Sequence, residues 1–382
     1  MDFSFTEEQE MWRKTMQDFT EKEAGREYTR MCDLQARYPQ ELWDAGVKQG
    51  FLGLLIPQEY GGMGGDAIMF TIFVECLAKY SYEMASVFHV PMFSATNVVD
   101  FGTKEQQEKY LPRFIRGEQR FSISMTEPEA GSDAASIITS AVLQDDHFLV
   151  NGQKQFSTGG HLPGNIMVMS VKTDRNAVPP RNGISVILVP NNLPGVECNV
   201  LPLIARRAVG TCSVFLSDVK VPRENLLGEL NGGWKVLTGH LEWERQAVCA
   251  ACCGESQSTL DDIMDYAKQR VQFGQTIGKF QDVGHRLVDL WCELQAVRSL
   301  TYKIAWMITE HIPCVKEVSA GKMLTTELLH KCALAGMEFM GGYSLLPDSD
   351  FERHWRNSRY LLVGGGATEV QRFVLSRLLG LR

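Results

Sequence analysis

The chain has 382 residues, of which 44% are hydrophobic and 22% charged, and its formal net charge at pH 7 is −8. The length predicts two or three packed units rather than one core. The composition is that of a globular protein and excludes a disordered or fibrous chain. The acidic balance argues against nucleic-acid binding, because phosphate affinity comes mainly from clustered Lys and Arg.

Membrane, targeting and metal signals are absent or weak. No run of about 18 apolar residues occurs, so no membrane-spanning helix is predicted. The first residues have neither signal-peptide nor transit-peptide composition, and we expect a cytoplasmic protein. Ten Cys are scattered through apolar contexts. The one C-x-x-C, from Cys249 to Cys252, lies in a helix-like stretch, which predicts buried small residues rather than a metal or redox site.

Helical patterns occupy the chain up to about residue 120. Thr6 is typical of a helix start, and Pro39 suits the first turn of a further helix. The glycine-rich run at 61–65 interrupts the pattern before a long apolar helix at about 66–80. One face of the first helix is expected to carry Phe5, Met11, Trp12, Met16 and Phe19.

From about residue 121, short β-branched or alternating runs replace the helical pattern. These runs lie at 121–125, 141–143, 148–150, 166–171, 184–189 and 213–216. Between them, Asn151-Gly152, Pro179-Pro180 and Pro194-Gly195 are typical of turns. The spacing predicts a small antiparallel β-domain of about 110 residues.

Helical patterns return after Asn231-Gly232-Gly233 and continue almost to Arg382. Helices are predicted at about 234–270, 280–311, 315–341 and 366–379. The predicted fold class is mainly α with a β-domain. It comprises an N-terminal α-helical domain at 1–120, a middle antiparallel β-domain at 121–230 and a C-terminal four-helix bundle at 231–382.

The common nucleotide and hydrolase motifs are missing: the sequence has no G-x-x-x-x-G-K-[ST], no G-x-S-x-G and no H-E-x-x-H. Six other strings occur in order, at 57–62 (PQEYGG), 126–133 (TEPEAGSD), 151–154 (NGQK), 221–228 (VPRENLLG), 270–274 (RVQFG) and 341–342 (GG). Together, and over essentially the whole chain, they resemble the FAD-dependent acyl-CoA dehydrogenase family.

This resemblance implies an FAD site. Met125 and Thr126 would contact the edge of the isoalloxazine ring, and Thr158, in the string that begins at Phe156, would approach its N5. A hydroxyl or amide donor at that edge stabilises the charge that arrives with a hydride. Ser132 would contact the pyrophosphate and the CoA substrate.

A second set of implied cofactor contacts comes from the C-terminal half. Arg270, with Phe273 in the same string, and Gln281 resemble residues that reach the FAD of a neighbouring subunit. Gly341 and Gly342 would let backbone amides approach the same cofactor. The resemblance therefore implies a homotetramer.

The reaction of the family needs a carboxylate that removes the α-proton while the β-hydrogen leaves as hydride to flavin N5. Most members carry this Glu in a loop before the last helix. Alignment on Gly366 and Gln371 puts Gly365 at that position, and glycine has no side chain. Other members place the Glu in an E-R pair on a helix, and Glu244 with Arg245 matches it. The resemblance implies Glu244 as the base.

Other residues near the base have different implied roles. Glu242 lies about 200° around the helix from Glu244, so both cannot face one flavin. It resembles an acidic position near the pantetheine arm of CoA, which Arg245 would support. Glu369 is expected near the cofactor but is a poor base candidate. The amide of Gly365 can still bind the thioester oxygen, together with a ribityl hydroxyl of FAD.

Three features of this region depart from the common family pattern. The glycines at 364–366 leave room above the flavin, which predicts a substrate that is branched, cyclic or polar near its α or β carbon. Asn357 replaces a common Asp, and Ala367 replaces a Thr that the family uses toward FAD. We expect local changes in cofactor binding rather than its loss.

The E-R pair with three glycines resembles a bacterial subgroup that includes crotonobetainyl-CoA reductase, so both directions of flux stay open. The favoured interpretation is a dehydrogenase or enoyl-CoA reductase that exchanges electrons with an electron-transferring flavoprotein. One alternative is an acyl-CoA oxidase, for which the chain is short. Another is a non-catalytic flavoprotein subunit, which Glu244 and the flavin strings oppose.

Overall fold

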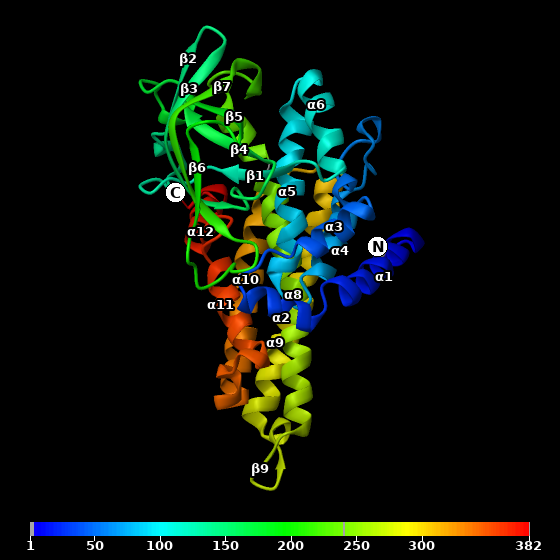
Figure 1. The fold of residues 1–382 in the computed structure, drawn as a ribbon. Helices are drawn as coiled ribbons and strands as arrows, with labels where there is room; N and C mark the ends of the chain where they lie inside the picture. Colours follow the sequence, from blue (N-terminus) through cyan, green and yellow to red (C-terminus); the bar gives the residue numbers. More distant parts are fainter. Residues whose placement is uncertain (1–3, 240, 382) are drawn as a thin grey trace.

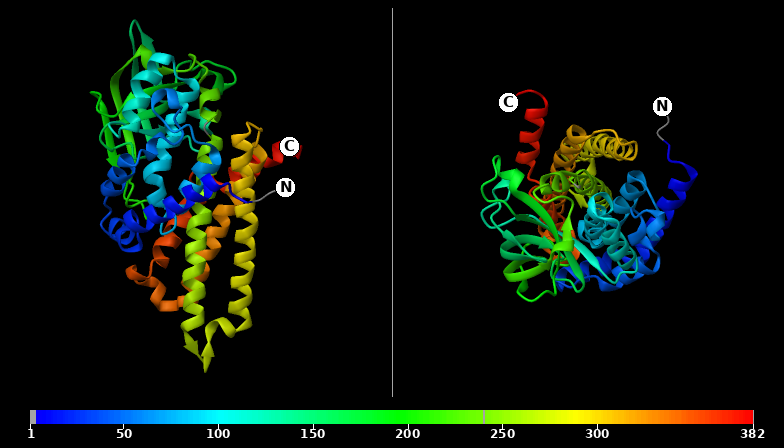
Figure 2. Two further views of the ribbon diagram at one scale, coloured as in Figure 1. Left: turned by 90° about the vertical axis from the view of Figure 1, so that its right-hand side faces the viewer. Right: turned by 90° about the horizontal axis from the view of Figure 1, so that it is seen from above.

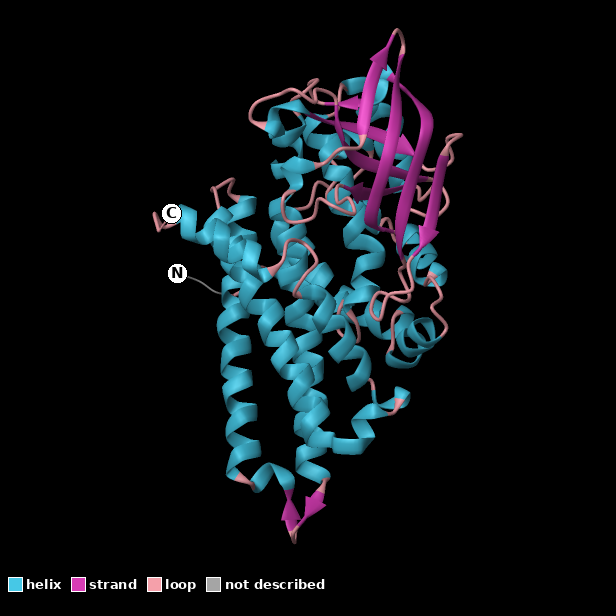
Figure 3. Cartoon of the chain, turned by 90° about the vertical axis from the view of Figure 1, so that its left-hand side faces the viewer, coloured by secondary structure: helices cyan, strands magenta, loops and turns pink. Residues whose placement is uncertain are grey.

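Helical, strand and again helical segments follow one another in the computed structural model, which describes residues 4–239 and 241–381 (Figure 1). The strands gather at one end of the molecule, and long helices run from them to a small hairpin at the opposite end (Figure 3). Within the described ranges, no helix is long and apolar enough to cross a membrane.

The N-terminal helices include one, α5, that is buried over most of its length. Their bounds are α1 Glu7–Glu23, α2 Arg26–Leu34, α3 Gln40–Lys48, α4 Ala67–Leu77, α5 Tyr82–Phe101 and α6 Lys104–Ile115. The predicted start of α1 is confirmed by a capping box between Thr6 and Gln9. Its predicted apolar face is wrong at Met11, which is 71% exposed, because five residues of helix turn Met11 about 140° away from the buried Met16.

The middle segment forms one mixed sheet. Its strands are β1 Arg120–Ser124, β2 Ser140–Gln144, β3 His147–Thr158, β4 Asn165–Lys172, β5 Ile184–Pro190, β6 Val196–Val200, β7 Thr211–Pro222 and β8 Leu226–Leu227. The order is β6-β7-β3-β2-β4-β5-β8, and β1 pairs with β4 off this path. Most pairs are antiparallel as predicted, but β1 runs parallel to β4 over its whole length.

The predicted turn at Asn151-Gly152 is wrong, because both residues lie inside β3. The register against β7 shifts between Val150 and Gly152, so the pair forms a bulge rather than a chain reversal. Gly152 has a φ of 148°, and a Cβ there would lie 2.7 Å from the backbone of Thr139. The glycine therefore permits a close approach of two backbones.

The C-terminal segment is a bundle of long helices. Its elements are α7 Gly233–Gly239, α8 Leu241–Gln269, the hairpin β9 Val271–Gln272 and β10 Gln275–Thr276, α9 Gln281–Thr309, α10 Val315–Met340, α11 Phe351–Leu361 and α12 Thr368–Leu378. α8, α9 and α10 pack side by side, and α4 packs against α8 and α9 (Figures 1 and 2). The predicted helix at 234–270 corresponds to both α7 and α8. The helix α11 was not predicted.

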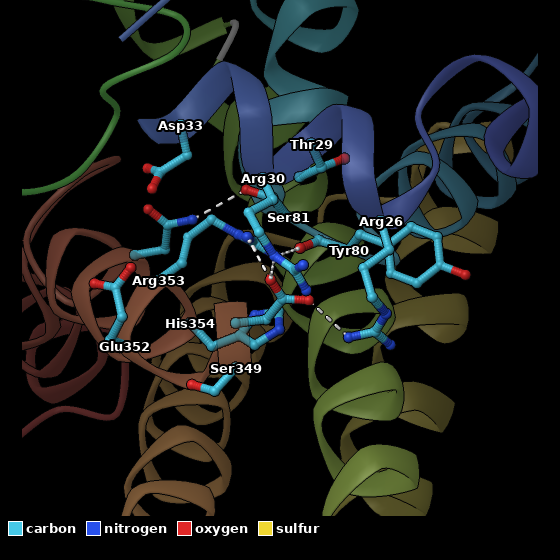
Figure 4. A network of polar contacts seen from close by, with 12 residues as sticks. Arg26, Thr29, Arg30, Asp33, Tyr80, Ser81, Ser349, Glu352, Arg353 and His354 are labelled. Atoms are coloured by element: carbon cyan, nitrogen blue, oxygen red, sulfur yellow. Dashed lines mark hydrogen bonds and ion pairs between the residues drawn. The ribbon is translucent and has the colours of Figure 1, made fainter. Parts of the chain in front are cut away.

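A buried polar network joins α2 to the start of α11 (Figure 4). Asp350 is 1% exposed and accepts hydrogen bonds from Arg26, Arg30 and Arg353, each at 2.8 or 2.9 Å. One carboxylate thus holds three arginines from two distant parts of the sequence. The network fixes α11 against the N-terminal helices, and α11 leads directly into the glycine loop at 364–366.

Candidate active site

The two positions that the resemblance offers for a base face the same space. Glu244 lies near the start of α8, and Gly365 lies in the loop between α11 and α12. A Cβ built on Gly365 would lie 3.8 Å from Oε1 of Glu244 and 3.6 Å from Cγ2 of Val248. A side chain at either position therefore reaches the same volume.

The neighbours of Glu244 on α8 have different surroundings. Glu242 is half-buried next to Cys314, the residue before α10, and burial raises the pKa of its carboxyl. Arg245 is buried, and its Nε has no hydrogen-bond partner among the described residues. Burial also lowers the pKa of the Arg245 guanidinium. The two acids of the L-E-W-E-R string thus point to different places, as their spacing on a helix requires.

A side chain at any of the three positions of the glycine loop would disturb its conformation. Gly365 and Gly366 have φ values of 65° and 87°, in the left-handed region. A Cβ on Gly364 would lie 2.9 Å from Cζ of Tyr360, so the tyrosine ring occupies the space beside the loop. Within the described ranges no acceptor takes the N–H of Gly365, and this amide remains available to a ligand oxygen.

Sequence reasoning missed Lys322, which lies beside the same space. Its side chain is fully buried, its Nζ donates to the carbonyl of Leu361 at 3.0 Å, and its Cε lies 4.0 Å from the Cβ position of Gly365. Burial lowers the pKa of the Lys322 ammonium to about 8, while Glu244 acts in the opposite direction. A Lys among the apolar residues of the helix predicted at 315–341 was the available signal.

The residues expected at the flavin ring come together at the end of β1 and in β3. Gln155 donates its N–H to the carbonyl of Thr126 at 2.8 Å, and Lys154 Nζ donates to that of Met125 at 3.2 Å. The hydroxyls of Ser124 and Ser157 are 2.8 Å apart. The two strings of residues, 125–126 and 156–158, are therefore neighbours.

Phe156 is strained and exposed at this place. Its φ is 62°, and 54% of the residue is exposed. The register of β3 against β7 shifts between Lys154 and Ser157, so Phe156 and the residue before it form a second bulge. A bulky residue in the left-handed region is uncommon, and bulges next to active sites often redirect a side chain. The strain indicates a functional surface.

A buried ion pair supports both strings. Lys154 Nζ lies 2.8 Å from Oε1 of Glu127, and both side chains are almost fully buried. Glu127 also accepts the N–H groups of Ile138 and Thr139. Burial lowers the pKa of Lys154 to about 8. The loop that follows is open: Ser132 is exposed, and a Cβ on Gly131 would meet nothing within 4 Å.

The second set of predicted cofactor contacts lies at the other end of the molecule. Arg270, Gly341 and Gly342 line one cavity of about 540 Å³. Phe273, at the tip of the β9–β10 hairpin, is 95% exposed, and Gln281 begins α9. Since α8 rises about 1.5 Å per residue, Arg270 lies on the order of 40 Å along the helix from Glu244. The two sets of residues therefore lie toward opposite ends of one chain (Figure 1).

The remaining predicted positions lie on α11 and at the start of α12. Glu369 is exposed in the first turn of α12. Ala367 is the N-cap residue of α12 and provides no side-chain cap. Asn357 is buried and donates to Oγ of Ser81 at 3.0 Å, which joins α11 to the start of α5.

Comparison with known proteins gives consistent matches over the chain. The family models for the acyl-CoA dehydrogenase N-terminal, middle and C-terminal domains match residues 6–118, 122–219 and 231–380. The caffeyl-CoA reductase–Etf complex subunit CarC of Acetobacterium woodii is 34% identical over 98% of this chain and 99% of its own. A 3-(aryl)acrylate reductase of Clostridium sporogenes is 33% identical over 97% and 98%. The structure of butyryl-CoA dehydrogenase from Megasphaera elsdenii superimposes with a TM-score of 0.94, at 31% identity and full coverage of both chains.

Proposed function

The chain belongs to the acyl-CoA dehydrogenase family, and from this premise we propose that Glu244 is the residue that moves the α-proton of the substrate. The family reaction is FAD-dependent α,β-dehydrogenation of an acyl-CoA thioester or the reverse reduction of an enoyl-CoA. One observation carries the assignment. The Glu244 carboxylate lies 3.8 Å from where a Gly365 side chain would begin, which supports its taking the role of the missing loop carboxylate.

Different groups of the chain then transfer the proton and polarise the thioester carbonyl. In dehydrogenation the Glu244 carboxylate accepts the α-proton, and in reduction its acid form returns it. The N–H of Gly365 binds the thioester oxygen and stabilises negative charge on it. Lys322 holds the carbonyl of Leu361, which positions the start of the loop, and places a buried cation beside the carboxylate. Glu242 and Arg245 are proposed to bind the CoA arm, as is Ser132.

The residues present fit FAD. Phe156 is exposed and has a positive φ, and Gly131 faces open space. The cavity at Arg270 is lined by glycines. A large planar and phosphorylated cofactor can cover these three places. When bound, FAD supplies the acceptor or donor of the β-hydride. Met125, Thr126, Phe156 and Thr158 would hold its ring.

We infer that the FAD site is completed by a second copy of the chain, in a homotetramer. The argument is one of distance, because Arg270, Gly341 and Gly342 lie at the far end of α8 from the ring-binding strings. Phe273 and Gln281 extend the same surface, and they would reach a partner's cofactor. Glu369 would border it from α12.

We propose reduction of an enoyl-CoA as the physiological direction, with an electron-transferring flavoprotein as electron partner. Two relatives at 34% and 33% identity carry reductase names, and one is named as the subunit of an Etf complex. A cytoplasmic location fits the ten cysteines, all of which are unpaired.

The test compares Glu244→Gln with the native protein. The amide cannot accept the α-proton, so bleaching of the flavin by acyl-CoA esters should fall by at least about a thousandfold while the flavin content is retained. Glu242→Gln is the matched comparison two residues away, and it should raise KM more than it lowers kcat. Native-rate bleaching by Glu244→Gln would refute the assignment.

A further inference from the structure

Two thiols, Cys198 on β6 and Cys212 on β7, lie together at one edge of the sheet. β6 is the edge strand, and it pairs with β7. Cys198 lies opposite Val214, two residues beyond Cys212, so the two cysteines are diagonal neighbours on one face of the sheet. Both sulfurs also contact Gly160. Cys198 Sγ donates to its carbonyl at 3.6 Å, and Cys212 Sγ lies 3.0 Å from where its Cβ would be.

The two thiols differ in access and in acidity. Cys198 is half-buried, whereas Cys212 is fully buried. A hydrogen bond from Cys212 lowers the pKa of the Cys198 thiol, and the same contact raises the pKa of Cys212. An accessible, acidic thiol next to a second cysteine is typical of redox-sensing pairs. By contrast, burial raises the pKa of each cysteine on α8, namely Cys249, Cys252 and Cys253.

The pair contacts the segment that is expected at flavin N5. Ser157 lies opposite Cys212 in the register of β3 and β7, and its carbonyl accepts from Cys212 Sγ at 3.3 Å. Gly160, which accepts from Cys198, follows Thr158 by two residues. The two thiols therefore hold the backbone on both sides of Thr158.

We propose that Cys198 and Cys212 form a reversible disulfide, and that its formation displaces Thr158 from the flavin ring. The reduced pair is the active form, because each S–H donates to the backbone at 157–160 and a disulfide has no S–H to donate. The effect on the flavin rests on the proposed function, whereas the formation of the bond does not.

The oxidant is hydrogen peroxide, and the reaction needs no further co-reactant. The Cys198 thiolate attacks one peroxide oxygen, the O–O bond breaks, and the leaving hydroxide takes up the proton that Cys198 released. The product is a sulfenic acid at Cys198. Cys212 Sγ then attacks this sulfur, the S–S bond replaces the S–O bond, and the hydroxyl leaves as water with the Cys212 proton. Two thiols lose two electrons, and one peroxide becomes two waters.

The positions of the two cysteines make the disulfide easy to reduce again. Diagonal neighbours in an antiparallel pair are about 7–8 Å apart, whereas the Cα atoms of a relaxed disulfide are about 4.4–6.8 Å apart. The edge strand β6 must therefore move toward β7 when the bond closes. Strained disulfides are the labile and regulatory ones, and a dithiol reverses them by exchange.

The test treats the FAD-loaded native protein with hydrogen peroxide and then alkylates the remaining thiols. Arg206 and Arg207 lie between the two cysteines, so trypsin separates them and only a disulfide keeps their peptides joined. Mass spectrometry should find the joined peptides, and dithiothreitol should release them.

The flavin should report the same change. Its visible absorption should shift on oxidation, because Thr158 moves at the ring. Bleaching by the fastest of a series of acyl-CoA esters should fall by about tenfold or more, since misplacement by about 1 Å at the reacting atoms costs at least this much. Dithiothreitol should restore both signals.

Cys198→Ser separates the disulfide from other effects of peroxide. Its hydroxyl can still donate to Gly160 but cannot form an S–S bond, so this variant should bleach at the native rate before and after peroxide. Cys292→Ser is the matched control, because it removes an exposed cysteine on α9 and should respond to peroxide as the native protein does.

Each outcome bears on a different claim. Absence of the joined peptides in the native protein would overturn the disulfide, and that measurement needs neither a variant nor a thioester. Joined peptides without any loss of bleaching, or an equal loss in Cys198→Ser, would overturn its control of the flavin segment. Failure of every thioester to bleach the reduced protein would instead reject the proposed function, and the peptides and the flavin spectrum would still decide this proposal.

Discussion

At the scale of single residues, Glu244 and Gly365 should be exchangeable in part. Side chains at both positions reach the same space, because a side chain on Gly365 would begin 3.8 Å from the Glu244 carboxylate. Adding Gly365→Glu to Glu244→Gln should restore flavin bleaching about tenfold or more above the single variant. Recovery will be incomplete, because φ at Gly365 is 65° and a side chain there costs about 1–2 kcal/mol.

The matched control places the new carboxylate one residue further along. Gly366 is also left-handed, but its Cβ would lie 2.7 Å from Nε2 of Gln371 and would not face Glu244. Gly366→Glu in the Glu244→Gln background should restore nothing. Equal recovery by both double variants would mean that position 365 has no special relation to the base.

Lys322 makes the stability of the protein depend on pH in a defined direction. Its pKa is lowered from 10.5 to about 8 by burial, so between these values the unfolded chain holds a proton that the folded chain has released. The free energy of unfolding therefore rises with pH across this window, and the cost of the buried ammonium is present in full below about pH 8. Lys322→Met removes that cost.

The measurement is urea unfolding of native and variant protein at about pH 7 and about pH 10. The stability of Lys322→Met relative to native should be higher at the lower pH, by at most about 3 kcal/mol. Lys331→Met, an exposed lysine on the same helix, is the control. A relative stability of Lys322→Met that is the same at both pH values would contradict the prediction.

The sequence allowed roles to be predicted for residues that belong to a motif. It gave no prediction for residues whose position depends only on tertiary packing. Glu244 and Gly365 came from motifs. Lys322 did not, because it belongs to no string and its burial depends on helices and loops far away in the chain. The strain at Phe156 was also invisible, since a register shift between β3 and β7 causes it.

At the scale of elements, Asp350 fixes α11 and hence the glycine loop that follows it. It accepts from three arginines in a buried place, and two of them come from α2 (Figure 4). Asp350→Asn leaves those cations without their counter-charge and should lower the free energy of unfolding by about 3–5 kcal/mol. Faster amide exchange in α2 than in α6 should accompany the loss.

Asp348 offers a control two residues away. It is exposed, and Asp348→Asn should change stability by no more than about 0.5 kcal/mol. If both variants behave alike in urea unfolding and amide exchange, the network does not hold α2 to α11.

Local sequence signals predicted elements well where they were self-contained. The capping box at Thr6 and the apolar runs of β4 and β5 need no distant partner. By contrast, the bulge at Asn151-Gly152 depends on pairing with the distant strand β7. The parallel arrangement of β1 likewise depends on its pairing with β4. The polar helix α11 depends on ionic partners in α2 and lacks an apolar run.

At the scale of the whole molecule, the proposed division of one FAD site between two chains predicts complementation. Glu244→Gln removes the base from its own site, and Arg270→Ala weakens the site of the partner. In a mixed pair, one site carries both defects and the other carries none. Co-expression of the two inactive variants should recover about a quarter of native activity, because half of random pairs are mixed and each restores one site of two.

The measurement is specific activity per subunit after co-expression, with each variant expressed alone as the control. Recovery well above the sum of the two single variants supports a shared site. No recovery from a purified mixed oligomer would show that Arg270 serves the same subunit as Glu244. The domain limits at 120 and 230 remain a separate prediction.

The helix α8 carries Glu244 near its start and ends at the residue before Arg270. One inserted or deleted residue would rotate the two ends relative to each other by about 100° and shift them by about 1.5 Å. Either the base or the contact with the neighbour would then be misdirected. During evolution, changes in length should therefore accumulate in the loops of the β-domain and be eliminated from α8. The number of residues between these two positions should vary less among descendants of this chain than the residues themselves.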